Sequence, residues 1–334
     1  AADVAVDAAL LAALKADPDG LLLRTAVRAG PAVLPAARQS GRSTRELALA
    51  RDPKLRQRYE EVSQQLASSA GNPLGTLLEK WRPTMQDLRE AEGDLPERGG
   101  LVFATLSKLV ASDALAGRAF DVAIVDEVSM SYPAQVVVAA AHARSRVNVF
   151  GDCRQLPPIV LSESVVARER LGRDVFTACG ADHPGASGVT MLKEQFRMHP
   201  QIRKVVSDFA YGGALRDAPG IEAEREPIAR RAPLPGHAVA WLDVGPLGAT
   251  RFFDRHHGSR FNPISALCCI RAAMELDGER AVILTPYRTQ ARLLGALVND
   301  AAMAHVEVGT IHRYQGSEAP TVIVDLVDGS GTKV

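Results

Sequence analysis

The chain has 334 residues, of which 46% are hydrophobic and 23% charged. This length predicts about two domains, and the composition excludes a chain that is disordered throughout. The 39 basic residues balance 39 acidic ones, and a net charge of zero argues against a bulk electrostatic attraction to nucleic acid or anionic lipid. Most of the basic residues are arginines, whose planar guanidinium still suits local contacts with phosphate.

The cysteines and the first residues indicate a cytoplasmic protein. No CxxC pair occurs among the four cysteines, which favours a reducing compartment without structural zinc; they are Cys153, Cys179, Cys268 and Cys269. No run of about 18 apolar residues predicts a membrane span, so we expect no membrane partner. The chain opens on AADVAVDAAL without a basic and apolar leader. Because the first residue is not Met, we expect the numbering to begin inside a longer polypeptide.

The first hundred residues are mainly helical in pattern. Residues 8–16 predict a short helix and residues 21–27 a buried strand. From about residue 43 to 97 the chain is polar, with apolar residues at helical spacing on both sides of a Gly-Asn-Pro break at 71–73. Two amphipathic helices joined by a tight break predict an antiparallel hairpin that projects from the main body. An ordinary helical subdomain and a hairpin that acts on a ligand both fit this pattern.

After residue 100 the pattern changes to apolar strands, polar loops and helices. The strands are expected at 101–105, 122–126, 147–152, 281–285, 306–310 and 321–327. Their apolar runs are continuous, which is typical of parallel strands buried on both faces. Helical crossovers are expected at 133–143 and 289–300. Residues 213–262 are rich in Pro, Gly and Arg with little regular pattern. We therefore predict an α/β fold of two domains, 1–188 and 189–334.

Acidic residues follow one of the predicted strands directly. Asp126 and Glu127 come at the end of the run that starts at residue 122, and ligand chemistry in open α/β sheets collects at the carboxyl ends of strands. Here an Asp can hold Mg²⁺ through water, while a neighbouring Glu can orient and deprotonate an attacking water. The alternative is that these carboxylates cap the next helix.

The next predicted strand ends in VFGDCRQLPPIV. Gly151 permits a sharp turn there, and Gln155 offers both a hydrogen-bond donor and an acceptor that can sense a γ-phosphate and help to place a water. Pro157 and Pro158 stiffen the exit from the strand. Two such strand ends in tandem favour a functional site over two separate structural features.

At this point the sequence resembles a known family. VDEVSM and GDCRQLPP resemble motifs II and III of the superfamily-one helicases, in the Upf-like, 5′→3′ branch, and LKEQFRMHPQI at 192–202 resembles motif IV. The resemblance implies that Arg197 is an arginine finger for the γ-phosphate and that Phe196 stacks on or near the adenine. A planar guanidinium suits this task because it can bind phosphate oxygens in pairs. The alternative is a buried Arg197 paired with Glu194 or Asp208.

Further motifs follow in the family's order. ILTPYRTQ at 283–290, VEVGTIHRYQGSEAPTVIVDLV at 306–327 and FATLSKL at 103–109 resemble three more helicase motifs. The resemblance implies that Gly316 and Glu318 face the nucleotide. It also implies a set of nucleic-acid contacts, namely Thr105, Pro157, Thr285, Tyr287, Thr310 and His312. A lone His such as His312 could instead be a structural residue whose hydrogen bonds are satisfied within the protein.

The resemblance has gaps at both ends. No GxxxxGK[ST] phosphate loop occurs. At the start, Ala2 and Asp3 stand where the end of motif Ia usually has Thr and Asn. The last residues, DGSGTKV, come before the family's Arg-bearing motif VI. We therefore expect other domains of the same polypeptide beyond both ends, and no ATPase activity from these residues alone.

The resemblance implies two RecA-like parallel-sheet domains of the P-loop NTPase type. The first, 1–188, would lack the strand of the phosphate loop and would carry a helical stalk at about 43–97. The second, 189–334, would end before motif VI.

The expected function is that of an ATP- and Mg²⁺-dependent enzyme. It would translocate on single-stranded DNA or RNA and unwind duplexes, in DNA repair or RNA processing. Two alternatives stay open: a nucleotide-dependent clamp or sensor that does not unwind, and a non-catalytic helicase-like scaffold.

Overall fold

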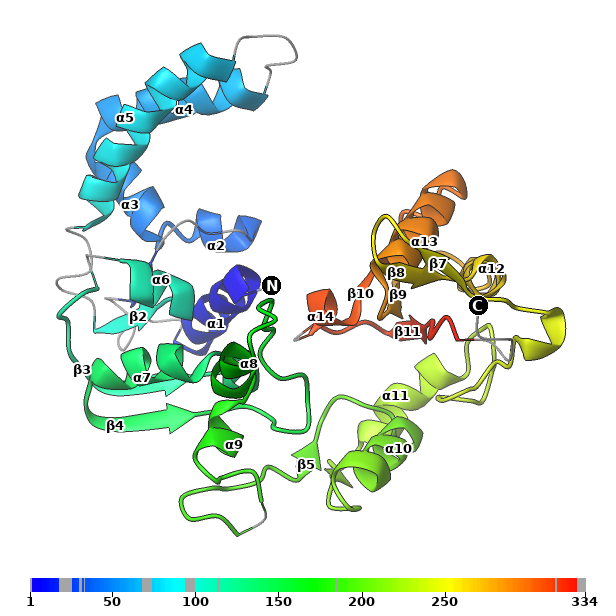
Figure 1. Ribbon diagram of the computed structural model, residues 1–334. Coiled ribbons are helices and arrows are strands. Elements are labelled where there is room, and N and C mark those ends of the chain that lie inside the picture. The colour runs from blue at the N-terminus through cyan, green and yellow to red at the C-terminus, as the bar shows by residue number, and fades with distance from the viewer. Residues whose placement is uncertain are drawn as a thin grey trace. The chain divides into compact units, whose positions relative to one another are not determined.

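The computed structural model describes residues 2–17, 26–29, 32, 34–67, 74–93, 100–112, 115–183, 185–315 and 317–328. The chain divides into two compact units, Ala1–Ala186 and Ser187–Val334, and both contain helices and parallel strands (Figure 1). The predicted α/β class with parallel sheets is therefore confirmed. Within the described residues, no helix is long and apolar enough to cross a membrane.

The first unit begins with helices around a pair of parallel strands. Its elements up to residue 103 are α1 (Ala2–Ala16), β1 (Ala26–Arg28), α2 (Pro35–Gln39), α3 (Thr44–Arg51), α4 (Pro53–Ala67), α5 (Leu74–Gly93) and β2 (Leu101–Phe103). β1 pairs with β2. A buried ion pair between Arg28 and Asp7 joins β1 to α1. Of the strand predicted at 21–27, residues 21–25 lie outside the described residues.

The helices between residues 43 and 93 pack on one another (Figure 1). Leu55 of α4 and Leu88 of α5 are buried in their shared core, and Arg45 pairs with Glu92 at 3.0 Å. The prediction of a single helix before residue 68 was wrong, because α3 and α4 are separated at Asp52. Pro53 explains the break, since a proline has no N–H and disfavours a helical residue before it. The break predicted at 71–73 lies outside the described residues.

The second pair of strands in the first unit is β3 (Phe120–Val125) and β4 (Ala143–Val149), which are parallel. The crossover between them is α7 (Pro133–Ala141). The other elements here are α6 (Leu106–Ala111), the 3₁₀ turn η2 (Val128–Met130), α8 (Val165–Leu171) and α9 (Val175–Ala178). The core of this region joins Val125 and Val128 to α7, α6 and α9.

The expectation that β3 is buried on both faces was wrong. Val125 is buried, but Val122 is 44% and Ile124 is 68% exposed. Successive side chains of a strand point to opposite faces, so the face that bears Val122 and Ile124 is the open one. The described helices α6, α7 and α9 pack with Val125 on the other face. A continuous apolar run therefore does not ensure that both faces are covered.

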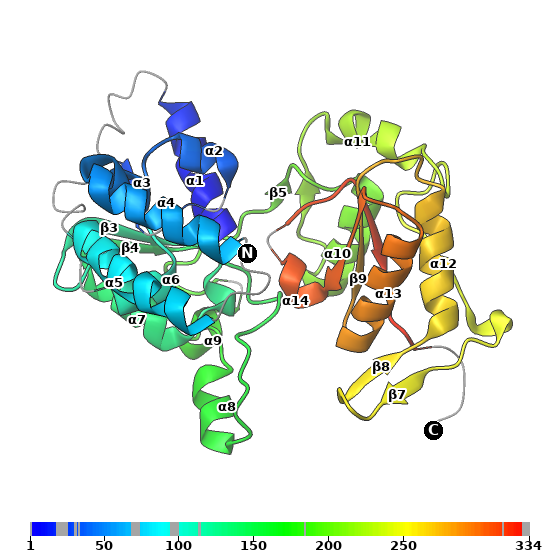
Figure 2. The same cartoon turned by 90° about the horizontal axis from the view of Figure 1, so that it is seen from above.

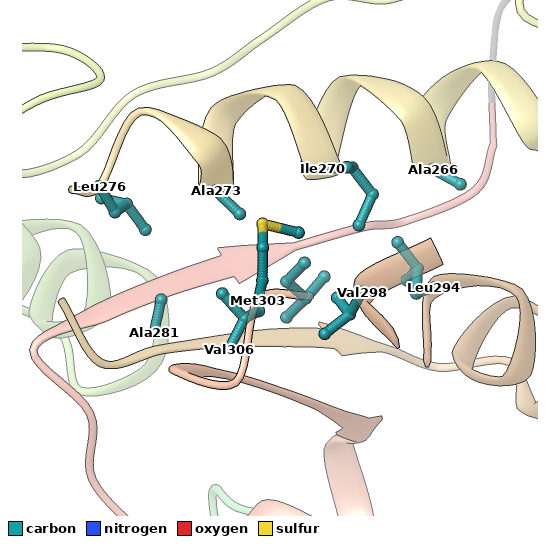
Figure 3. Close-up of a cluster of buried hydrophobic side chains, with 10 residues drawn as sticks. Ala266, Ile270, Ala273, Leu276, Ala281, Leu294, Val298, Met303 and Val306 are labelled. Carbon is teal, nitrogen blue, oxygen red and sulfur yellow. The ribbon is translucent and has the colours of Figure 1, made fainter. Parts of the chain in front are cut away.

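The second unit is built on a three-stranded parallel sheet. β9 (Ala281–Thr285) lies between β10 (Val306–Thr310) and β11 (Thr321–Val324). The first two strands have the predicted bounds, and the third ends before the predicted residue 327. α12 (Pro263–Met274) and α13 (Arg288–Asp300) cover the sheet, and their side chains fill its core (Figure 3). Ala281 and Ile283 of β9 have no exposed surface.

The region from 213 to 262, in which the sequence showed little pattern, contains regular elements. β5 (Glu194–Gln195) pairs in parallel with β6 (Arg216–Asp217), and β7 (Phe252–Asp254) forms an antiparallel hairpin with β8 (Ser259–Phe261). The remaining elements of the unit are α10 (Pro200–Ala210), α11 (Ile221–Ala229), η3 (Gly245–Leu247) and α14 (Ile311–Tyr314). These strands are too short for periodicity to reveal.

A buried polar network joins four elements of the second unit. The Asn262 side chain accepts hydrogen bonds from the backbone at the start of α12. Gln290 of α13 donates from Nε2 to Asp325 Oδ2 at 2.6 Å, and its Oε1 accepts from the backbone N–H of Asn262 at 2.8 Å. Asn262 also donates to the carbonyl of Val327. The network thus holds the end of β8 and the segment after β11 against α12 and α13.

Candidate functional site

Asp126 and Glu127 lie exposed at the carboxyl end of β3. Asp126 accepts a hydrogen bond on Oδ1 from the backbone N–H of Glu127 at 2.9 Å. Glu127 has φ 53° and ψ 38°, the left-handed conformation that costs a residue with a side chain roughly 1–2 kcal/mol. Such strain persists only where the surroundings impose it, and it clusters at functional sites. Asp277, Ala302 and Val327 also have positive φ, so this strain supports the predicted base only together with the place of Glu127 beside Asp126 at the strand end.

The loop after β4 is held directly against this turn. The N–H of Val128 donates to the carbonyl of Phe150 at 3.0 Å, and the N–H of Phe150 donates to the carbonyl of Val125 at 2.8 Å. A Cβ added at Gly151 would lie 3.0 Å from Val128 Cγ2 and 3.1 Å from the backbone N of Ser129. Glycine is required here for this close approach, rather than for the predicted turn alone.

Gln155 and Pro157 are exposed in the same loop, and Pro158 is buried. Gln155 donates from Nε2 to Asp152 Oδ2 at 2.8 Å, an interaction that the sequence did not indicate. Together with the backbone contacts above, this brings the two predicted strand ends, 126–127 and 151–157, to one edge of the β3–β4 pair. The arrangement places carboxylate oxygens and an amide at the same edge, groups that can hold Mg²⁺ and orient an attacking water.

Thr105 lies in the first unit just before α6. Its Oγ1 accepts a hydrogen bond from the backbone N–H of Lys108 at 3.1 Å, so it caps the helix. The hydroxyl proton is still available, because a threonine hydroxyl both donates and accepts. The predicted phosphate contact can therefore coexist with the cap.

In the second unit, the structure brings two predicted nucleotide residues together. Arg197 Nη2 lies 2.5 Å from Glu318 Oε1, and both side chains are largely exposed. They line one cavity with Phe196, which is also exposed. The alternative of a buried Arg197 paired with Glu194 or Asp208 was wrong. Gly316 lies outside the described residues.

Gln195, which sequence reasoning missed, shapes the loop that carries Arg197. Its Oε1 accepts from the backbone N–H groups of Arg197 at 2.9 Å and Met198 at 2.6 Å, and its Nε2 donates to Asp217. Arg203 binds the same Asp217 with a closest N–O distance of 2.6 Å. The hydrogen bond from Arg203, and then that from Gln195, lower the pKa of Asp217. Asp217, held by Arg203, thus anchors Gln195 and with it the loop that carries Arg197.

The predicted nucleic-acid residues of the second unit differ in accessibility. Thr285 and Thr310 pair in register at the ends of β9 and β10, but Thr285 is fully buried and its Oγ1 accepts from the N–H of Tyr287 at 3.4 Å. Its side chain is therefore not presented to a ligand, contrary to expectation. His312 is exposed on α14.

Tyr287 is half-buried at the start of α13. Its hydroxyl accepts a hydrogen bond from Arg260 Nη1 at 3.1 Å, and the Arg260 guanidinium carbon lies 5.6 Å from the centre of its ring. The sequence did not connect Arg260 to this residue, because the two are far apart in the chain. Arg260 lies on β8, and the hairpin therefore borders the candidate nucleic-acid residues of this unit.

Two family models, each described as an AAA domain, match the chain at residues 33–163 and 171–333. Helicase SEN1 of Saccharomyces cerevisiae is 27% identical over 312 residues, which are 84% of this chain and 13% of that protein. Probable helicase MAGATAMA 3 of Arabidopsis thaliana is 28% identical over 290 residues, 80% of this chain and 33% of that protein. DNA-binding protein SMUBP-2 of Mesocricetus auratus is 28% identical over 222 residues, which are 62% of this chain and 21% of that protein.

The chain thus spans at most a third of the length of these relatives. The two models cover most of its residues, including the segments that carry the ordered helicase motifs. The chain belongs to the Upf-like branch of the superfamily-one helicases.

Proposed function

We propose that these residues form part of the motor of an ATP-dependent helicase, which moves along single-stranded DNA or RNA and separates duplexes. In this proposal each unit is a RecA-like domain, and α3–α5 are an inserted helical stalk. The observation that carries the proposal is the left-handed Glu127 beside Asp126, held by backbone hydrogen bonds against the loop that bears Gln155. Strain of this kind at the carboxyl edge of parallel strands fits a catalytic site.

Asp126 fits the role of a Mg²⁺ ligand. Its carboxylate is exposed, and it accepts a hydrogen bond from the backbone N–H of its own neighbour, Glu127. Mg²⁺ needs one or two carboxylates together with phosphate oxygens and waters. The described residues contain no group of three or more His, Cys, Asp or Glu side chains that could hold a metal ion. The ion would neutralise negative charge on the phosphates of ATP.

The other residues of the site have separate tasks in this proposal. Glu127 accepts a proton from the attacking water, and Gln155 orients that water. Arg197 supplies positive charge to the γ-phosphate, while Phe196 stacks on the base and Glu318, with Gly316, contacts the nucleotide. Without ATP, the Glu318 carboxylate is paired with the Arg197 guanidinium, to which the γ-phosphate would bind. ATP must therefore exchange with this carboxylate at Arg197.

A single strand would be held mainly through its backbone. The side chains available for this are those of Thr105, Pro157, Tyr287, Thr310 and His312. Thr285 would act indirectly, by fixing the backbone before Tyr287. Contacts to phosphate and sugar position a strand without reading its bases, so we expect little sequence preference.

The decisive variant is Glu127→Gln in the complete polypeptide that contains these residues. It keeps the shape of the side chain but removes the base, so ATP binding should persist while turnover falls at least about a hundredfold. Glu163→Gln, at another exposed carboxylate of the same unit, serves as the matched control and should keep full turnover. Retained turnover in Glu127→Gln would remove this residue as the base.

Two further assays separate the proposal from its alternatives. Strand displacement by the complete polypeptide distinguishes a helicase from a clamp or sensor that uses the same motifs. The absence of any ATP turnover would instead identify a scaffold. Residues 1–334 alone contain no phosphate loop, so we expect no turnover from them, and measured turnover would contradict that expectation.

A further inference from the structure

The β7–β8 hairpin presents an exposed face that none of the roles above uses. Phe253 is directly opposite Arg260, and Phe252 is opposite Phe261. Residues directly opposite each other in an antiparallel pair share a face, so Phe253 and Arg260 lie together. On the other face, Phe252 is 50% exposed and stacks on Phe261 with ring centres 5.5 Å apart. Phe253 is 59% exposed, so a large aromatic ring on the strand position opposite Arg260 is left open to solvent.

The hairpin is fixed firmly to the start of α13 (Figure 2). Thr289 donates from Oγ1 to Asp254 Oδ2 at 3.0 Å and from its N–H to Ser259 Oγ at 3.2 Å. Arg260 reaches the hydroxyl and the ring of Tyr287. Phe253 and Arg260 therefore continue the surface at Tyr287, which the proposed function assigns to the nucleic-acid strand.

The charges on the hairpin leave one cation free for a ligand. Asp328 balances Arg251 at 2.9 Å and Arg260 at 3.6 Å. Asp254 binds His257 at 2.7 Å. Arg255 is exposed at the hairpin turn, and no described residue forms an ion pair with it. The turn therefore carries a spare positive charge next to an open aromatic ring.

We propose that Phe253, Arg255 and Arg260, here named the hairpin surface, extend the binding track beyond Tyr287 for single-stranded nucleic acid. A base stacks on Phe253, and Arg255 contacts a phosphate. Every base has a π-face that can stack on an aromatic side chain, while the backbone follows positive charge. This inference rests on the proposed function, because it places Tyr287 on the same strand. Another protein segment could cover Phe253, but it would not require the free cation at Arg255.

The test is a fluorescence anisotropy titration of the full chain. The probes are a labelled oligothymidylate and a labelled oligouridylate, titrated at several salt concentrations. Phe253→Ala should weaken binding roughly tenfold, since a stacked base is lost, with an unchanged salt dependence. Arg255→Ala should weaken binding and reduce the slope of log affinity against log salt by about one, because one phosphate contact is lost.

Two controls match these variants. Phe209→Ala removes a 93% exposed phenylalanine on α10, away from the hairpin. Arg271→Ala removes an exposed arginine on α12. Both should bind like the unaltered chain. If they weaken binding as much as the hairpin variants do, the hairpin surface is not a specific site and the inference is overturned.

A third variant separates this inference from the proposed function. Tyr287→Ala should weaken binding on its own account. If it does so while Phe253→Ala and Arg255→Ala bind normally, the hairpin inference fails and the nucleic-acid role of Tyr287 stands. If the unaltered chain binds neither probe, both fail. If Phe253→Ala changes the association state of the chain by light scattering but not its affinity for the probes, the hairpin surface binds protein, and the inference is again overturned.

Discussion

β3 in the β3–β4 pair of the first unit and β9 in the β10–β9–β11 sheet of the second both carry apolar runs but differ in burial. Ile283 of β9 has no exposed surface, whereas Ile124 of β3 is largely exposed. The second sheet has a packed core beneath α12 and α13 (Figure 3). In the first unit, the candidate residues are held mainly by backbone hydrogen bonds and by the close approach at Gly151. An apolar run thus predicts a strand that can be buried, but the helices and strands packed against it determine which of its side chains are buried.

The largest expected effect is at the two isoleucines. Ile283→Ala should lower the free energy of unfolding of the second unit by about 2–5 kcal/mol, because it removes buried methyl groups and leaves a cavity. Ile124→Ala should change that of the first unit by less than about 0.5 kcal/mol, since the side chain is already solvated. Urea denaturation of residues 1–334 measures both. Equal losses would show that the open face of β3 is covered in solution.

A smaller effect is expected from the polar network of the second unit. Gln290→Leu removes the donor at 2.6 Å to Asp325 Oδ2, which keeps Ser265 Oγ as a donor, and it leaves the buried N–H of Asn262 without its acceptor. An unsatisfied buried polar group costs about 1–3 kcal/mol. Gln57→Leu, on the exposed surface of α4, should stay within about 0.5 kcal/mol. Both are measured by the same denaturation. An unchanged stability of Gln290→Leu would mean that the network contributes nothing net.

One glycine in each unit tests how tightly its surroundings are packed. In Gly151→Ala the added Cβ meets Val128, Phe176 and the backbone of Ser129 at 3.0–3.1 Å, so about 1–2 kcal/mol of stability should be lost. Gly295 lies in α13 with nothing within 4 Å of such a Cβ. Gly295→Ala should raise the thermal midpoint slightly, since alanine favours a helix by up to about 1 kcal/mol. We therefore expect opposite signs for the two variants, and a Gly151→Ala variant of unchanged stability would show that the neighbours of Gly151 shift to accept the methyl group.

The smallest effect is a pH dependence confined to high pH. Burial, and then the hydrogen bond from Tyr314 to Glu307, raise the pKa of Tyr314 to about 12. The ordinary pKa of tyrosine is about 10. The neutral form is thus favoured in the folded state, and its contribution to stability is complete below about pH 10 and is lost as the pH rises through about 12. Tyrosinate absorbance measures this titration, and Tyr314→Phe should remove the late step.

The sequence predicted some of these features well and others not at all. β9 and β10 were predicted with their observed bounds, and both strands begin directly after a polar residue, Arg280 and His305 respectively. The left-handed backbone of Glu127 was not visible, since it depends on hydrogen bonds to the next strand. Likewise the pairing of Arg197 with Glu318 joins residues that are far apart in the chain. Thr285 looked accessible at a strand end but is buried beneath its neighbours.

The most direct test of the proposed motor is the rate of ATP hydrolysis by the complete polypeptide, measured against the concentration of single-stranded nucleic acid. The rate should rise to a plateau as nucleic acid is added. Arg197→Ala should lower that plateau by about a thousandfold, the effect of removing an arginine finger, while single-stranded nucleic acid still binds. A rate that does not respond to nucleic acid, or an Arg197→Ala variant with an unchanged plateau, would contradict the proposed motor.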